Sequence, residues 1–368
     1  MSTGSATSYR SRLAGNVSRY SAANLEPVLA LRRALFGEGP QCDPAYFRWQ
    51  FEDNPSNEGA PPQLWIYAKG GQILGEQGGI PVALRVGSAT YRGSWAIDLV
   101  VRPEHKLRGI GAVLSETYVA ENEVTIGLSV SEEARRAFLR AGWIDLGTLP
   151  LHVRPLETKE LLSLRWRERP GRWAGQALDV PLRSIDGLAG LSTKLAGVQL
   201  APIHRFDARA DVLWETAARS YKVIGRRRAE DLNWRYFTGP QRGRYRGLYL
   251  YSGERVVGYA VLRVGEWRGA KVGYVIDYLC APRWIPALFV QCLRYFRRHE
   301  AAAVYCLHAG AAAAQVLPWL GFLTRDSHCR LMVRPGASVP IEARTMLMDP
   351  SSWFVTYGDS DVDHPRAP

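Results

Sequence analysis

The sequence predicts a mixed α/β fold with two related halves, each containing a mixed, mostly antiparallel sheet flanked by helices. Three observations lead to this prediction. An apolar run that ends at Pro103 is followed by a short basic loop and a helix that opens on two glycines. A second strand and helix follow and end at Gly142. The same order of patterns recurs in the C-terminal half, and strands that alternate with helices indicate a sheet covered by helices.

The segment from Val100 to Ala112 is suited to binding a phosphate group. Glycine lets backbone N–H groups approach a ligand without a Cβ in the way, and both Gly109 and Gly111 lie at the predicted helix start. A helix start supplies unpaired N–H donors and a partial positive charge. Lys106 and Arg108 add full positive charges. The glycines alone are also compatible with an ordinary strand–turn–helix junction.

The residues after the loop predict a helix, a buried strand and a second helix. The first helix extends from Gly109 to about Asn122 and has apolar residues at the spacing of one helix face. The apolar run 124–130 predicts the strand. Ser131 is a suitable N-cap for the second helix, and Gly142 is a suitable residue to end it.

These motifs resemble two signatures of the GNAT superfamily (Gcn5-related N-acetyltransferases). Lys106-Leu107-Arg108-Gly109-Ile110-Gly111 resembles the family's acyl-CoA-binding motif, Arg/Gln-x-x-Gly-x-Gly/Ala, with Lys in the first position. The ending Gly142-Trp143 resembles the second signature, Tyr-x-x-x-Gly-Phe, with Phe138 where many members carry Tyr. The resemblance covers roughly residues 26–150.

The resemblance implies acetyl-CoA, or another acyl-CoA, as co-substrate. In the family the strand before the loop splays from the next strand, and the pantetheine arm inserts between them like an extra strand. Here those strands are expected at 96–101 and 124–130. A backbone N–H near Leu99 or Val100 would then bind the acyl carbonyl oxygen. The residues expected to bind the co-substrate are Leu99, Val100, Val101, Lys106, Leu107, Arg108, Gly109, Ile110, Gly111 and Ala112.

An internal repeat relates the two halves. Asp98 and Gly142 are separated by 44 positions, as are Asp277 and Gly321, which lie in similar sequence contexts. The second copy lacks the Gly-x-Gly loop and instead has Trp284 followed by Pro286, which lacks an N–H donor. This resembles a tandem-GNAT arrangement in which a degenerate second copy shapes the acceptor site. The expected ranges are 1–155 for the acyl-CoA-binding domain, 156–205 for a connecting helical segment, 206–335 for the degenerate domain and 336–368 for a C-terminal tail.

Three residues are candidates for acid–base chemistry. Asp98 lies on the strand before the loop, although its match Asp277 in the degenerate copy favours a structural role. Glu76 has Tyr259 as its counterpart and is therefore specific to the first copy. Because Phe138 cannot protonate a leaving thiolate, Tyr118 is a possible substitute, and solvent is another. His105, in the loop, is more simply explained as a solvated side chain.

Composition limits the remaining possibilities. The content is 46% hydrophobic and 22% charged, as in globular proteins, and we expect neither a membrane-spanning helix nor a secretory signal. Five scattered cysteines without a Cys-x-x-Cys argue against structural zinc and a disulfide framework and favour a reducing cytoplasm. No metal is expected, because no histidine has metal-ligand spacing. The net charge of +12 suits polyanionic ligands, although nucleic acid is the less favoured one.

Three functions remain open from the sequence. The first is a CoA-dependent N-acyltransferase that acylates an amine of a small molecule, such as an amino sugar or a nucleotide-sugar. The second is a Fem-type transferase that uses aminoacyl-tRNA, although the intact Gly109-Ile110-Gly111 loop argues against it. The third is a non-catalytic acyl-CoA-binding or scaffold protein, which Phe138 and the eroded second copy favour. The sequence does not reveal the oligomeric state.

Overall fold

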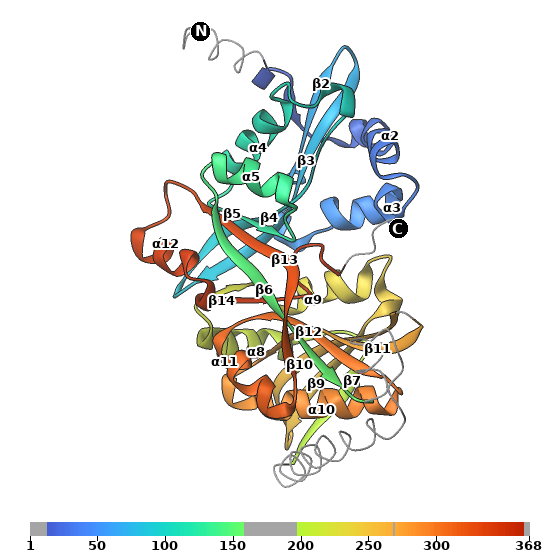
Figure 1. Ribbon diagram of the computed structural model, residues 1–368, viewed down its shortest axis with the longest axis vertical. Coiled ribbons are helices and arrows are strands. Elements are labelled where there is room, and N and C mark those ends of the chain that lie inside the picture. The colour runs from blue at the N-terminus through green and yellow to red at the C-terminus, as the bar shows by residue number, and fades with distance from the viewer. Residues whose placement is uncertain (1–12, 158–196, 268, 364–368) are drawn as a thin grey trace, which may run out of the picture. The chain divides into compact units, whose positions relative to one another are not determined.

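The computed structural model describes residues 13–157, 197–267 and 269–363 (Figure 1). The described residues form two compact units. The first unit draws on the described residues within Met1–Leu146, Arg330–Met348 and Ser360–Pro368, and the second on those within Gly147–Cys329 and Asp349–Asp359. No described helix has both the length and the apolar character needed to cross a bilayer.

The first unit contains one mixed sheet with helices beside it (Figure 1). Its strands, in spatial order, are β1 (Val17–Arg19), β2 (Leu64–Lys69), β3 (Gln72–Val86), β4 (Ala89–Val101), β5 (Val124–Leu128) and the end of β13 (Leu323–Pro335). Only β4 and β5 are parallel among these neighbours. The helices are α2 (Leu25–Phe36), α3 (Pro44–Phe47), α4 (Ile110–Ala120), α5 (Glu132–Arg140) and α12 (Ile341–Met348).

The second unit has a sheet of the same kind. Its strands, in spatial order, are β6 (Ile144–Pro155), β12 (Ala303–Ala309), β11 (Ala270–Cys280), β10 (Arg255–Trp267), β9 (Arg246–Ser252) and β7 (Val198–Ile203). Here β11 and β12 form the parallel pair. The unit also contains β8 (Val223–Gly225), β14 (Trp353–Thr356), α8 (Ala208–Ala217), α9 (Ala229–Asn233), α10 (Ile285–Arg298) and α11 (Ala311–Val316).

The two halves of the sequence exchange strands. Residues 331–335 of β13 pair with β5 of the first unit, whereas residues 151–155 of β6 pair with β12 of the second. The units therefore depart from the expected ranges 1–155 and 206–335 at these two strands. The expected connecting segment also ends earlier, because Val198–Ile203 forms β7 beside β9. Most of that segment, 158–196, lies outside the described residues.

The expected tail is divided between the units. Its α12 and the residues from Ser360 onward belong to the first unit, and Asp349–Asp359 belongs to the second. Trp353 and Phe354 are buried in the strand β14, which agrees with the apolar character of that run. The part of the expected tail after Asp363 lies outside the described residues.

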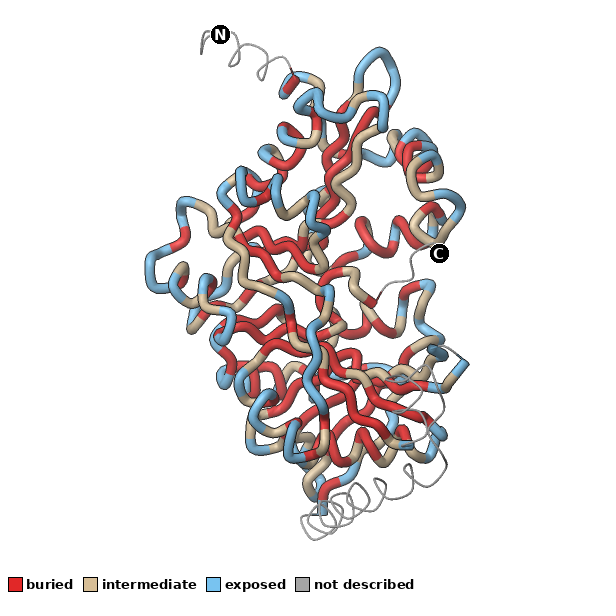
Figure 2. The backbone as a smooth tube through the Cα atoms, viewed as in Figure 1, coloured by how far each residue is buried: buried red, intermediate tan, exposed pale blue. Residues whose placement is uncertain are grey.

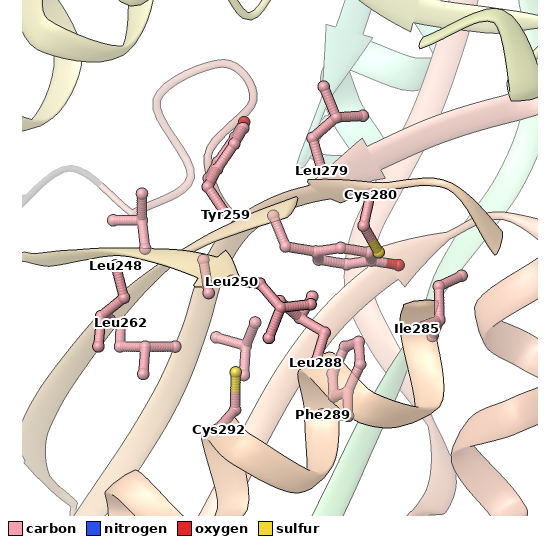
Figure 3. Close-up of a cluster of buried hydrophobic side chains, with 14 of the residues drawn as sticks. Leu248, Leu250, Tyr259, Leu262, Leu279, Cys280, Ile285, Leu288, Phe289 and Cys292 are labelled. Atoms are coloured by element: carbon pink, nitrogen blue, oxygen red, sulfur yellow. The ribbon is translucent and has the colours of Figure 1, made fainter. Parts of the chain in front are cut away.

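Many residues of the strands in both units are buried (Figure 2). Figure 3 shows the core of the second unit, where side chains of α10 pack beside those of β9, β10 and β11. Phe289 of α10 is fully buried there and makes edge-on ring contacts with Tyr278 and Phe322.

We expect Phe289→Ala to lower the free energy of unfolding by about 3–5 kcal/mol, because the truncation leaves a cavity in this packed core. The control is Trp319→Ala, which removes an aromatic side chain that is 83% exposed and should change stability little. Denaturant unfolding measures both. Equal effects of the two substitutions would contradict the packing described for α10.

Candidate functional site

The parallel strands β4 and β5 part from one another near their carboxyl ends. They pair only through Gly93–Ala96 and Val124–Gly127, with four registered pairs. Beyond Ala96, β4 continues to Val101 along β3. β5 ends at Leu128, where it is still paired with β13 on its other edge, through Leu331. The main chain of β4 therefore loses its partner on one side while it remains held on the other.

A β-bulge in β4 lies at this point. Glu76 pairs with Val100 and Gly78 pairs with Ile97, so Asp98 and Leu99 together oppose the single residue Gln77. Asp98 has φ 50°, the left-handed conformation that non-glycine residues seldom adopt. The side chain of Gln77 compensates, because its Nε2 donates to the carbonyl oxygens of Ile97 at 2.9 Å and Gly78 at 2.8 Å. The bulge redirects backbone groups of β4 away from the ladder.

A cavity of about 530 Å³ occupies the space beside the bulge. Backbone and side chains of β4 and of the turn after β5 form one part of its lining, and residues of the α2–α3 region form another. The lining residues are Phe36, Gln41, Tyr46, Gln50, Gln77, Ala96, Ile97, Asp98, Leu99, Val100, Leu128, Ser129, Val130, Ser131, Ala134, Phe138 and Asp361. Of the predicted co-substrate residues, Leu99 and Val100 contribute to this lining.

Both predicted carboxylates meet a buried arginine. Nη2 of Arg32 lies 2.8 Å from Oε1 of Glu76 and donates to Oδ2 of Asp98 at 3.2 Å. The side chains of Arg32 and Glu76 are fully buried, and that of Asp98 is 22% exposed. The Arg32 guanidinium also lies over the rings of Phe47 and Phe51, at 5.2 and 5.0 Å from their centroids. The structure thus brings Glu76 and Asp98 together.

The two carboxylates differ in access to the cavity. Asp98 lines it and Glu76 does not, so Asp98 is the carboxylate that can contact a ligand there. Burial, with the nearby charge of Asp98, raises the pKa of Glu76 to about 7, although Arg32 opposes this shift. One guanidinium facing two carboxylates leaves a net negative charge when both are ionised.

The glycine loop has the conformation that the sequence predicts. After a 3₁₀ turn at Pro103–His105, Gly109 caps α4 with φ 84°, which favours glycine. Lys106, Leu107 and Arg108 are exposed beside the helix start. A Cβ on Gly111 would meet only Val101 at 3.7 Å and Leu99 at 4.0 Å, which are ordinary contacts. The chain itself therefore does not require glycine at position 111.

The structure does not support the prediction that Tyr118 acts as an acid. Tyr118 is fully buried in the core between α4 and the sheet, where its ring packs edge-on against Trp65. It does not line the cavity, and burial raises the pKa of its hydroxyl further above the ordinary value. Phe138 does line the cavity and stacks on Trp143 at 4.3 Å, beside Ser129 and Ser131.

The second unit closes the corresponding opening with its own chain. β11 and β12 also pair over four residues, Val272–Val275 with Ala303–Cys306. Beyond them β14 pairs with β12, and the N–H of Gly358 donates to the carbonyl of Ile276 in β11 at 2.8 Å. Pro286 lies in the first turn of α10. Residues of the segment 353–358 thus bond to both β11 and β12 where these two strands stop pairing.

Asp277, the match of Asp98, belongs to a buried network in the second unit. It accepts hydrogen bonds from Arg227 at 3.1 Å, Tyr259 at 2.9 Å and Thr356 at 3.0 Å. Arg227 also pairs with Asp359 at 2.6 Å. Asp277 therefore has a structural role, as the sequence comparison of the two copies suggested for this position. Asp98 also pairs with a buried arginine, Arg32, but its side chain lines a cavity and is partly exposed.

Sequence reasoning missed three residues of the site. Arg32 lies among the apolar residues of α2, and an arginine at the spacing of a buried helix face was the available signal. Gln77 directly follows the candidate Glu76. Asp361 belongs to the expected C-terminal tail, and no local signal in the sequence places it at this cavity. Among the described residues no three His, Cys, Asp or Glu side chains are grouped as a metal site requires.

The raised pKa of Glu76 predicts a pH-dependent stability. The folded-state pKa of about 7 exceeds the ordinary value of 4.5, so the contribution of Glu76 is fully present below pH 4.5 and is lost as the pH rises through 7. Between pH 5 and pH 8, the free energy of unfolding of the wild type should fall relative to Glu76→Gln by on the order of 2 kcal/mol. Denaturant unfolding at both pH values measures this. The exposed Glu121→Gln is the control, and a constant difference between wild type and Glu76→Gln would contradict the buried environment.

Comparisons with known proteins identify solved structures that have a similar fold. No family model matches the sequence, and no curated protein matches it. The structure is similar to a GCN5-related N-acetyltransferase from Kribbella flavida (TM-score 0.59, 13% identity), covering 87% of this chain and 70% of that one. It is similar to another GCN5-related N-acetyltransferase, from Anabaena variabilis (TM-score 0.57, 11% identity), covering 87% of this chain and 72% of that one. It is also similar to Saccharomyces cerevisiae N-myristoyltransferase with bound myristoyl-CoA (TM-score 0.51, 11% identity), covering 86% of this chain and 82% of that one. The chain therefore has the fold of the GCN5-related N-acetyltransferase superfamily.

Proposed function

We propose that the protein is a CoA-dependent N-acyltransferase that transfers an acyl group, most simply acetyl, to an amine of a small molecule. One observation carries the proposal: the first unit keeps an opening between β4 and β5, with a bulge and a cavity, directly before a glycine loop. The shared fold supports it, because structures with this fold include acyltransferases and one of them holds an acyl-CoA. An amino sugar or nucleotide-sugar acceptor, and a cytoplasmic location, remain part of the proposal.

The residues of the first unit match the parts of an acyl-CoA. Backbone amides at the start of α4, with Lys106 and Arg108, would hold the pyrophosphate. The unpaired edge of β4 after Ala96 would bond to the amide groups of the pantetheine arm, as a sheet edge binds an extended peptide. Backbone N–H groups at the bulge, near Leu99 and Val100, would stabilise charge on the carbonyl oxygen.

Asp98 is the residue best placed to accept a proton from the acceptor. In acyl transfer the amine nitrogen forms a bond with the carbonyl carbon and the carbon–sulfur bond breaks. The proton from the ammonium would pass to Asp98, directly or through water. Glu76 would act through Arg32, since both carboxylates share that guanidinium. A thiolate is a stable leaving group near neutral pH, so the transfer would not require a proton donor at position 138.

Phe138 favours one second candidate function. Because it places a ring, with no proton to donate, against the cavity, the protein can instead bind acyl-CoA without turnover. Measuring free CoA released in the presence of a panel of amines distinguishes the two functions. Tight acyl-CoA binding without amine-dependent release would mark the non-catalytic alternative.

We expect Gly111→Glu to weaken acetyl-CoA binding by at least about 30-fold, roughly 2 kcal/mol, because a carboxylate would occupy the place proposed for a pyrophosphate. The fold should remain stable, since a Cβ at position 111 meets only ordinary contacts. Isothermal titration calorimetry measures the affinity. Ala120→Glu adds the same charge at the exposed far end of α4 and should bind normally. Equal affinities of wild type and Gly111→Glu would exclude the proposed loop.

We expect Asp98→Asn to lower kcat by about 100-fold, because it removes the proton acceptor while preserving the side-chain shape. Acetyl-CoA affinity should change little, since the pyrophosphate contacts lie elsewhere. Steady-state assays of CoA release give kcat, and the exposed Asp53→Asn is the matched control. An unchanged kcat would remove Asp98 from the mechanism and leave it a structural role like that of Asp277.

A further inference from the structure

The cavity of the first unit has a charge opposite to that of the chain. The chain carries 47 Lys and Arg against 35 Asp and Glu, for a net charge of +12. The described residues that line the cavity nevertheless include two carboxylates, Asp98 and Asp361, and no Lys, Arg or His. Arg32 lies behind this lining, where Asp98 and Glu76 share its charge. The charged residues in the lining of this cavity are therefore acidic, although the chain as a whole is basic.

Two uncharged lining residues, Gln77 and Gln41, have a buried amide oxygen that accepts no hydrogen bond from the described residues. Gln77 lines the cavity and is only 1% exposed. Its Nε2 donates to the carbonyl of Ile97 in the bulge. Its Oε1 accepts no hydrogen bond from any described residue. The buried Oε1 of Gln41, also in the lining, accepts none among the described residues either. The two amide oxygens can accept N–H or O–H groups from a ligand, and the carboxylates of Asp98 and Asp361 line the same cavity.

Asp361 reaches this cavity from the far end of the sequence. The residues from Ser360 onward belong to the first unit, whereas the preceding β14 belongs to the second. Ser360 has φ 58°, a left-handed turn at the point where the chain changes unit. Its Oγ donates to Oδ1 of Asp361 at 3.2 Å, which restricts the carboxylate. The C-terminal segment thus adds an acidic group to a site otherwise built from residues before 140.

We infer that the cavity binds its amine acceptor as a cation, held by Asp98 and Asp361, and that it rejects acceptors carrying a phosphate. An ammonium group supplies three donors and a positive charge, which complements the acceptor atoms of the lining. A phosphate would face two carboxylates without any basic lining residue to neutralise it. Of the two acceptor classes in the proposed function, this inference selects amino sugars over nucleotide-sugars, because a nucleotide-sugar carries phosphate groups.

The inference rests on the proposed function only for the fate of the amine, because binding of a cation needs no acyl-CoA. Calorimetric titration of the full chain without acyl-CoA tests it with two series of probes. The first is 1,4-diaminobutane, 4-aminobutan-1-ol and 1,4-butanediol, which share a carbon chain and differ in charge. The second is glucosamine against glucosamine 6-phosphate, which share the amine and differ by the phosphate.

We expect affinity to fall at least tenfold for each ammonium replaced by hydroxyl, and glucosamine to bind at least tenfold more tightly than its 6-phosphate. Asp361→Asn should weaken 1,4-diaminobutane about tenfold without changing acetyl-CoA affinity or the melting temperature. Glu121→Gln removes an exposed charge from the same unit and should leave amine binding unchanged. In turnover assays Asp361→Asn should raise KM for the amine more than it lowers kcat.

Three results would overturn the inference: equal binding of the diol and the diamine, equal or tighter binding of glucosamine 6-phosphate, or an Asp361→Asn variant with wild-type affinity for the diamine. Normal acetyl-CoA binding alongside any of these would leave the proposed function standing and remove only the cationic acceptor. Loss of acetyl-CoA binding by the wild type is a separate failure, which would remove the transferase and not the cation site.

Discussion

The candidate site depends on the point at which β4 stops pairing with β5. A parallel ladder that ends after four pairs leaves main-chain N–H and C=O groups of β4 without a strand partner, and such groups are costly unless a ligand or water satisfies them. The bulge at Asp98 adds a left-handed residue to this edge. Gln77 and Arg32 stabilise that conformation from two sides, by bonding to the carbonyl of Ile97 and to the Asp98 carboxylate. The exposed edge is therefore supported by buried polar contacts, as a functional feature would be.

The second unit shows how the same constraint is met without a ligand. Its parallel pair is equally short, and β14 with Gly358 satisfies the groups left beyond it. Asp277 and Arg227 hold that filling segment through Thr356 and Asp359. The same backbone problem thus has an internal solution in one unit, whereas in the other the corresponding space is a cavity. This difference, more than the missing glycines, explains why we place acyl-CoA in the first unit only.

The sequence predicted what depends on neighbouring residues. The loop, the helix after it and the cap at Ser131 follow from short patterns, and the structure has them. The place where two strands part was implied by the family resemblance, and the structure has it too. The pairing of Arg32 with Glu76 and Asp98 joins residues 44 and 66 positions apart, so no local pattern reveals it. The strand exchange and the position of Asp361 depend on contacts across the whole chain. Tyr118 was misjudged because a helix period shows which face is apolar but not that its hydroxyl would be enclosed.

Charge separates the two ends of the site. The loop before α4 presents Lys106 and Arg108 with the positive end of a helix, while the cavity at the bulge presents Asp98 and Asp361. An acyl-CoA is anionic at its pyrophosphate, and an amine is cationic before it reacts. Residues 98–101 of β4 connect the two environments directly, so each reactant would be attracted to its own end and repelled from the other. A single strand edge can then align a thioester with an amine without a group that binds both.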